Sequence, residues 1–113
     1  MALAKKYIID AVGICKQTGS VVVSLMDEED WDEEDEHIKL LQDKLATYLR
    51  FIESGDMQKA YPKAQGRTVR IEIRGRCRPS EGGQRFLDET AERIRAKGID
   101  VQTSYESPWD SFL

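Results

Sequence analysis

Residues 19–55 read GSVVVSLMDEEDWDEEDEHIKLLQDKLATYLRFIESG, and this stretch decides the fold. Its first part has the period of a half-buried strand, with Val21, Val23 and Leu25 on one face. Its last part repeats apolar residues within about a third of a helical wheel, the pattern of an amphipathic helix: Ile38, Leu41, Leu45, Tyr48, Leu49 and Ile52. Gly55 ends this helix. The stretch therefore predicts a strand that leads through a polar segment into a long helix.

The polar segment is a run of acids from Asp27 to Glu36, in which nine of ten residues are carboxylates and the tenth is Trp31. Asp32 is a suitable helix N-cap, and carboxylates in a first helical turn are favoured by the helix dipole. Part of this acidity therefore has a structural role. Since the run lies between two regular elements, we expect it at a defined corner of the folded domain.

Similar patterns lie on both sides of this stretch. The apolar run 7–16 ends at a turn containing Gly19, which predicts a β-hairpin with the strand that follows. Residues 56–67 predict a short turn of helix and then a loop, and residues 68–75 alternate as a half-buried strand. A second helix begins after Ser80 as N-cap and closes at Gly98, and residues 99–105 form a last strand.

The element order is thus β-β-α-β-α-β. Strands joined through helices are expected to run parallel, whereas the opening hairpin is antiparallel. We predict an α+β fold: a two-layer sandwich with a mixed four-stranded sheet and both helices on one face. The other face would then carry Arg70, Glu72 and Arg74.

Composition limits the class of protein. A chain of 113 residues, 40% hydrophobic and 34% charged, suits one compact domain over residues 1–113. No apolar stretch approaches the roughly 18 residues that span a bilayer, and the first residues lack the apolar region of a secretory signal, so we expect a cytoplasmic protein and no membrane partner. Cys15 and Cys77 have neither metal-ligand spacing nor the density of a disulfide scaffold, and are expected to be reduced, partly buried thiols.

Charge is unevenly distributed. The run 27–36 carries −9 while the whole chain carries −4, so the remainder carries +5. Much of this excess lies in one basic segment: Lys63, Arg67, Arg70, Arg74, Arg76 and Arg78. Such a distribution favours charged partners or neutralisation within the fold. Nucleic acid is an unfavoured partner, because a chain with a pI near 5.1 repels another polyanion at long range.

No catalytic or cofactor signature accompanies these charges. The acidic run lacks the central glycine and spaced acids of an EF-hand, so no metal site is assigned. His37 is the only histidine, and beside Asp35 or Glu36 it could act as a general base, although a solvated or capping role is commoner in a first helical turn. No nucleophile–base set and no glycine-rich phosphate loop is recognised, so catalytic residues and cofactors are both assigned as none.

Several pieces together carry a resemblance to a known family. They are Thr18-Gly19, Asp30-Trp31-Asp32, Glu36-His37 leading to Leu40-Leu41-Gln42, the string Tyr48 to Gly55, Tyr61-Pro62 with Gly66-Arg67, and Pro79-Ser80-Glu81. Over roughly residues 9–99 the chain resembles a family of small uncharacterised bacterial proteins, a domain of unknown function. The resemblance implies a bacterial intracellular protein with a small α+β fold and supplies no reaction. The number of acids before Trp31 and of arginines after the third strand departs from that family's usual pattern.

The sequence therefore favours a non-enzymatic protein-binding module, most concretely an immunity or inhibitor protein for a basic toxin. Charge speeds the encounter with a basic partner, and an aromatic side chain can anchor the complex. The candidate binding residues are Asp27, Glu28, Glu29, Asp30, Trp31 and Asp32. Two alternatives stay open: a small regulatory or housekeeping homodimer that associates through its open sheet face, and an enzyme whose site is not recognised.

Overall fold

The computed structural model describes residues 8–105. Its regular elements are β1 (Ala11–Ile14), β2 (Val21–Asp27), α1 (Glu34–Glu53), α2 (Asp56–Ala60), the 3-10 turn η1 (Pro62–Ala64), β3 (Val69–Gly75), α3 (Glu81–Arg95) and β4 (Asp100–Tyr105). The predicted order β-β-α-β-α-β is confirmed, and α2 with η1 is the short helical segment expected after Gly55. The ends of the predicted run 7–16 do not belong to β1, which is only four residues long.

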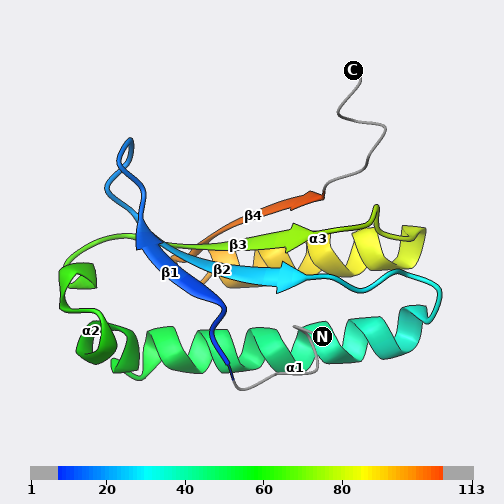
Figure 1. Ribbon diagram of the computed structural model, residues 1–113, viewed down its shortest axis with the longest axis horizontal. Coiled ribbons are helices and arrows are strands. Elements are labelled where there is room, and N and C mark those ends of the chain that lie inside the picture. Colours follow the sequence, from blue (N-terminus) through cyan, green and yellow to red (C-terminus); the bar gives the residue numbers. More distant parts are fainter. Residues whose placement is uncertain (1–7, 106–113) are drawn as a thin grey trace.

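The four strands form one mixed sheet in the order β1-β2-β3-β4 (Figure 1). β1 pairs with β2 antiparallel, and the turn between them places Gly19 at a φ of 77°. β2, β3 and β4 are parallel. Their last residues stand in register, Asp27 beside Gly75 and Gly75 beside Tyr105, so the carboxyl ends of three strands meet at one edge.

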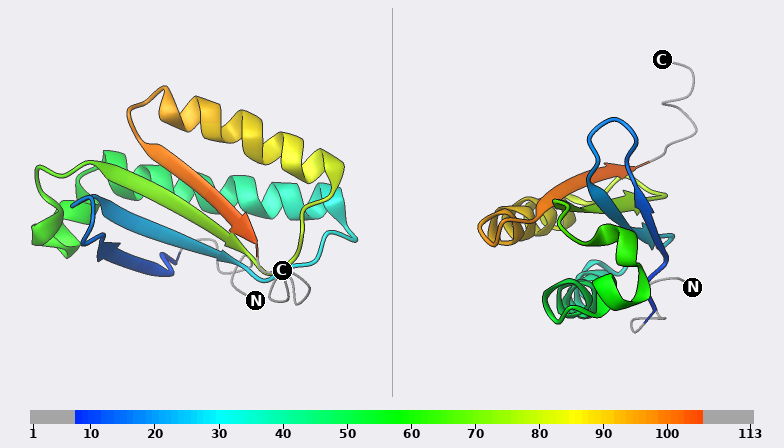
Figure 2. Two further views of the ribbon diagram at one scale, coloured as in Figure 1. Left: turned by 90° about the horizontal axis from the view of Figure 1, so that it is seen from above. Right: turned by 90° about the vertical axis from the view of Figure 1, so that its left-hand side faces the viewer.

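Both long helices cover the same face of the sheet, as the end-on view in Figure 2 shows. The strand side chains on that face alternate inward and meet the apolar stripes of α1 and α3. Leu45 from α1, Leu87 from α3 and Ile71 from β3 are all buried in this single core. The two-layer α+β sandwich predicted from the periodicities is confirmed.

Helix α1 begins later than predicted. Glu33 occupies the N-cap position, and no side chain accepts a hydrogen bond there. The prediction of Asp32 as N-cap is therefore wrong, because Asp32 belongs to the preceding loop, where its amide donates to Asp30 Oδ1 at 3.1 Å. By contrast, Ser80 caps α3 as predicted and accepts a hydrogen bond from the amide of Gly83 at 3.2 Å.

The segment after α1 also contributes to the core. Met57 of α2 is fully buried, while Leu40, Phe51 and Tyr61 are partly buried and pack against the core. The C-terminal residues Trp109 and Phe112 lie outside the described residues.

Candidate functional site

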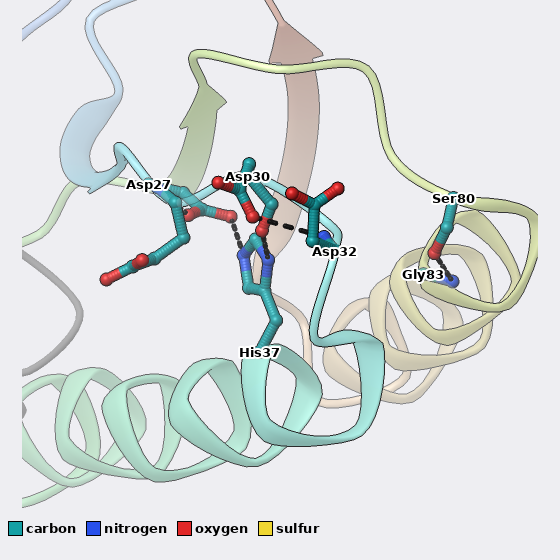
Figure 3. Close-up of polar contacts among 7 residues, drawn as sticks. Asp27, Asp30, Asp32, His37, Ser80 and Gly83 are labelled. Carbon is teal, nitrogen blue, oxygen red and sulfur yellow. Dashed lines mark hydrogen bonds and ion pairs between the residues drawn. The ribbon is translucent and has the colours of Figure 1, made fainter.

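The two ends of the acidic run meet in a buried histidine–carboxylate pair: Asp27 is its first residue, and His37 follows its last. Asp27 is the last residue of β2 and 4% exposed, and His37, in the first turn of α1, is 3% exposed. His37 Nε2 lies 2.6 Å from Asp27 Oδ2, and His37 Nδ1 lies 2.7 Å from the carbonyl oxygen of Asp30. Figure 3 shows the imidazole directed from α1 into the loop that connects β2 to α1.

These contacts fix where protons are held. A carbonyl oxygen only accepts, so Nδ1 of His37 must be the donor to Asp30. One further proton then lies between Nε2 and Asp27 Oδ2, and the pair is either an imidazolium with a carboxylate or a neutral imidazole with a carboxylic acid. Burial raises the pKa of Asp27, and its hydrogen bond with His37 acts in the opposite direction.

The histidine is consequently a structural group. Both ring nitrogens already have partners, the carboxyl group of Asp27 at the end of β2 and the carbonyl oxygen of Asp30 in the loop, which leaves none for a substrate. The expectation that His37 is solvated or caps the helix is wrong, and its carboxylate partner is Asp27 rather than Asp35 or Glu36. Among the described residues, no group of three or more histidine, cysteine or acidic side chains is arranged to hold a metal ion.

Trp31 covers this pair. Its ring stacks on that of His37 with centroids 3.6 Å apart and an angle of 17° between the planes. The other contact of the indole is with the start of α3, where a Cβ atom at Gly83 would overlap the ring. Trp31 is thus partly buried between the two helices, and its ring occupies space at position 83 that only a glycine, which has no side chain, leaves free.

The glycine just before Gly83 leaves room for a carboxylate. A Cβ atom at Gly82 would overlap the carboxylate of Glu34, and Glu34 Oε1 accepts a hydrogen bond from Ser80 Oγ at 2.8 Å. An acid of α1 therefore lies at the N-terminus of α3, where the helix dipole favours negative charge. This explains why two glycines follow the cap of α3.

The remaining acids of the run face water. Most are exposed, among them Glu28, Asp30, Asp32 and Glu33. No ion pair between residues 8 and 105 involves a carboxylate of residues 28–36. Arg70 and Arg74 lie beside Glu72 on the uncovered sheet face, with Arg74 at 3.0 Å. The basic segment accordingly does not neutralise the acidic run within the described part of the chain.

A second buried polar cluster ties the start of the chain to α1. Lys44 is fully buried, and its Nζ lies 2.9 Å from the carboxylate of Asp10. Tyr48 donates to the carbonyl oxygen of Ser24 at 2.6 Å, and burial raises the pKa of its hydroxyl. The carboxylate of Asp10 also accepts from the amide of Met26 at 2.9 Å. Because every strong donor in this cluster has a partner, it fastens β2 and the preceding segment to the helix.

The six residues predicted to bind a partner separate into two groups. Glu28, Asp30 and Asp32 are exposed, and Glu29 and Trp31 are partly exposed, so these five lie where a partner could reach them. Asp27 is buried and directed at His37. Sequence reasoning missed Lys44 and the Asp27–His37 pair. The burial of Lys44 could have been predicted from the sequence, because this residue falls on the apolar stripe of the helix between Leu41 and Tyr48.

A hollow lies beside the pair, at the edge where the three parallel strands end. It has a volume of about 320 Å³ and is lined by the last residues of β2, β3 and β4 together with side chains of Trp31 and α3. The carboxyl edge of a parallel sheet is where ligands commonly bind in α/β folds. The candidate site of this protein therefore has an exposed acidic loop and, beside it, a partly open pocket.

Fold and site together define a small two-layer α+β protein in which a buried histidine–carboxylate pair and a stacked tryptophan hold an acidic loop. No helix among residues 8–105 is long and apolar enough to cross a membrane. The chain belongs to a family of unknown function, DUF6572, whose sequence model matches residues 1–107. No curated protein and no solved structure matches the chain.

Proposed function

We propose that this protein is a non-enzymatic binding module that docks a basic protein through its acidic loop, by which we mean residues 28–36, the segment between β2 and α1 together with the first turn of α1. In its most concrete form it is an immunity or inhibitor protein that neutralises a basic toxin. The observation that carries the proposal is the state of the eight carboxylates in the loop: they are concentrated at one corner, and none forms an ion pair with a described cation.

The way the loop is held supports this use. Like charges side by side repel one another, so an unsupported run of acids would extend away from the domain. Here both ends are fixed, at Asp27 and at His37, and the ring of Trp31 is stacked on that of His37. A loop that is already ordered loses little conformational entropy when a partner binds.

The partly exposed Trp31 ring adds an apolar contact within the charged surface. Aromatic side chains surrounded by polar residues are typical of the central contacts of protein interfaces. In this proposal the carboxylates speed encounter and the tryptophan contributes to the lifetime of the complex.

The test compares two charge-matched variants in affinity capture from the source cells. The loop variant carries Glu28→Gln, Asp30→Asn and Asp32→Asn, all exposed, and leaves the buried Asp27 intact. The control carries Asp56→Asn, Glu89→Gln and Glu92→Gln, which are exposed carboxylates outside the loop. Both variants lose the same charge, so a difference between them reports the place of the charge and not its total.

The expected result is a basic protein retained at low salt by the wild type and the control, lost from the loop variant, and released near 0.5 M salt, where exposed charge contacts are screened. The purified partner should also lose its activity when the wild-type protein is added. Equal capture by all three proteins would contradict the proposal.

One observation favours a second candidate, a homodimer that associates through the uncovered face of the sheet. That face carries apolar Val22 and Met26 beside the alternating charges Arg70, Glu72 and Arg74, and such alternation can pair with a second copy of itself. Sedimentation equilibrium of the wild type and of Met26→Glu separates this candidate from the first: a dimer lost on substitution supports it, and a monomeric wild type excludes it.

A further inference from the structure

We infer that the pocket at the carboxyl ends of β2, β3 and β4 binds a small amine with an aromatic or other apolar body. This ligand is distinct from the protein partner proposed above, and either proposal stands if the other fails.

The first argument is the position and size of the pocket. The residues that end the three parallel strands, Asp27, Gly75 and Tyr105, all line it, and Trp31 and Leu87 close it from the side of the helices. Its volume of about 320 Å³ falls at the lower end of the range of small-molecule sites, roughly 300–1,000 Å³. At about 30 Å³ for each water in the liquid, the space equals some ten water molecules, enough for one ring with a short side chain.

The second argument is the chemistry of the walls. Two aromatic rings, Trp31 and Tyr105, and three apolar side chains, Ile73, Pro79 and Leu87, belong to the lining. Such walls suit a flat apolar body, which gains from leaving water and from contact with ring faces. The polar side chains Asp27, Gln84, Thr103 and Ser104 also belong to the lining and can set the orientation of a ligand.

The third argument is charge. Asp27 is the one carboxyl group in the described lining, and no described lysine, arginine or histidine lines the pocket. The lining itself therefore offers an anionic ligand no cation, because His37, the partner of Asp27, does not line the pocket, and burying an unpaired charge is costly. The guanidinium of Arg78 lies 5.7 Å from the centroid of the Tyr105 ring but is not part of the lining.

A cationic ligand meets the opposite situation. Each carboxylate oxygen can accept two hydrogen bonds. In the imidazolium–carboxylate form of the pair, Asp27 accepts one at Oδ1 from the amide of Glu29 and one at Oδ2 from His37. Acceptor capacity remains on both oxygens for an ammonium group. The eight carboxylates of the neighbouring loop add a field that attracts positive charge to this edge.

The experiment uses three probes with the same ring and different charge: phenethylamine, 2-phenylethanol and 3-phenylpropionate. Binding to the full-length protein is followed through amide chemical shifts in two-dimensional NMR, at one pH near 7.5 and low salt. We expect phenethylamine to bind at least tenfold more tightly than 3-phenylpropionate, with the largest shifts at Ile73, Gly75, Leu87 and Thr103. Butylamine, which lacks the ring, should bind at least tenfold more weakly than phenethylamine.

Two substitutions on one strand provide the matched control. Thr103 lines the pocket, whereas Gln102 is its neighbour on the opposite face of β4, and both are exposed enough to accept a larger residue. Thr103→Phe should weaken phenethylamine binding at least tenfold, and Gln102→Phe should leave it unchanged. Neither substitution touches the buried pair, so folding can be verified from the unchanged remainder of the spectrum.

Three results would overturn the inference: no binding of phenethylamine, equal binding of the amine and the acid, or shifts confined to residues 28–36. The last result would assign the amine to the exposed acidic loop. It would leave the proposed docking function intact, so failure of the pocket and failure of the loop are distinguishable.

Discussion

Gly83→Ala tests the packing that holds the acidic loop, because helix propensity and tertiary packing predict opposite signs for it. Gly83 lies inside α3, where alanine is intrinsically favoured over glycine by about 1 kcal/mol. In the structure, however, a Cβ atom there overlaps the ring of Trp31, which is itself stacked on His37 at 3.6 Å. The ring cannot move away without disturbing the buried pair.

The magnitude follows from these two contributions. Overpacking at a filled site costs about 1–3 kcal/mol. Taking about 2 kcal/mol for the overlap and about 1 kcal/mol for the propensity gain, Gly83→Ala should lower the free energy of unfolding by about 1 kcal/mol. In a Trp31→Ala background the overlap is absent, so the same substitution should raise the free energy of unfolding by up to about 1 kcal/mol.

A double-mutant cycle measures this reversal of sign. The four proteins are wild type, Gly83→Ala, Trp31→Ala and the double variant, unfolded in urea and followed by circular dichroism at 222 nm so that loss of a tryptophan does not affect the signal. The expected coupling between the two sites is about 2 kcal/mol, well above the roughly 0.5 kcal/mol within which independent sites add. If Gly83→Ala stabilised the wild type, or changed the free energy of unfolding equally in both backgrounds, the proposed packing of Trp31 against Gly83 would be refuted.

Three further predictions concern the core, the buried carboxyl and one thiol. Leu45→Ala and Ile71→Ala should each lower the free energy of unfolding by about 2–5 kcal/mol in urea denaturation, because both side chains are buried in the core. Unchanged denaturation midpoints would show that these two residues do not belong to the core. Burial raises the pKa of Asp27 above its usual 3.8, so the carboxyl group of Asp27 holds its proton more tightly in the folded protein than in the unfolded chain. The contribution of Asp27 to stability is therefore complete below pH 3.8 and declines as pH rises through the raised pKa. The free energy of unfolding of the wild type minus that of Asp27→Asn should therefore fall with rising pH above 3.8, and a difference that rises instead would show that burial does not dominate the pKa of Asp27. Hydrogen bonds from the Thr18 side chain and from the backbone of Thr18 and Gln17 lower the pKa of Cys15 to about 7. In a Cys77→Ser background, the rate of iodoacetamide labelling should therefore rise with pH through a midpoint near pH 7, and Thr18→Val should move this midpoint upward. A midpoint unaffected by Thr18→Val would count against Thr18 as the cause.

The architecture could be predicted from the sequence because each element has a clear period and a clear end. The alternation at Val21, Val23 and Leu25 gave the strand and its inner face, and the stripe through Leu41 and Leu45 gave the helix. Ser80 was recognisable as a cap because its side chain acts on a neighbour three residues away. Local signals of this kind depend little on the rest of the fold.

The candidate site was predictable only in part, since its contacts join segments that no local pattern relates. His37 finds its carboxylate ten residues earlier, at the end of β2, and not among the acids adjacent to it in the helix. The register that brings Asp27 beside Gly75 and then Tyr105 depends on pairing of three distant strands. Gly82 and Gly83 gave no hint of their partners, because what they accommodate, Glu34 and Trp31, comes from the other helix and the loop before it.

In the acidic run, the buried Asp27 fixes the position of the segment that carries the other eight carboxylates. Placing Asp27 against His37 gives the loop a fixed first point, and the bond from His37 to the carbonyl of Asp30 gives it a second. Between these points the chain has few conformations left, so repulsion among Glu28, Asp30 and Asp32 cannot be relieved by spreading apart. Part of that repulsion is therefore retained in the folded protein, and a cation that binds to the loop would reduce it. Trp31 stacks on His37 and also lines the pocket, so the ligand proposed for the pocket and the partner proposed for the loop would both bind next to this ring.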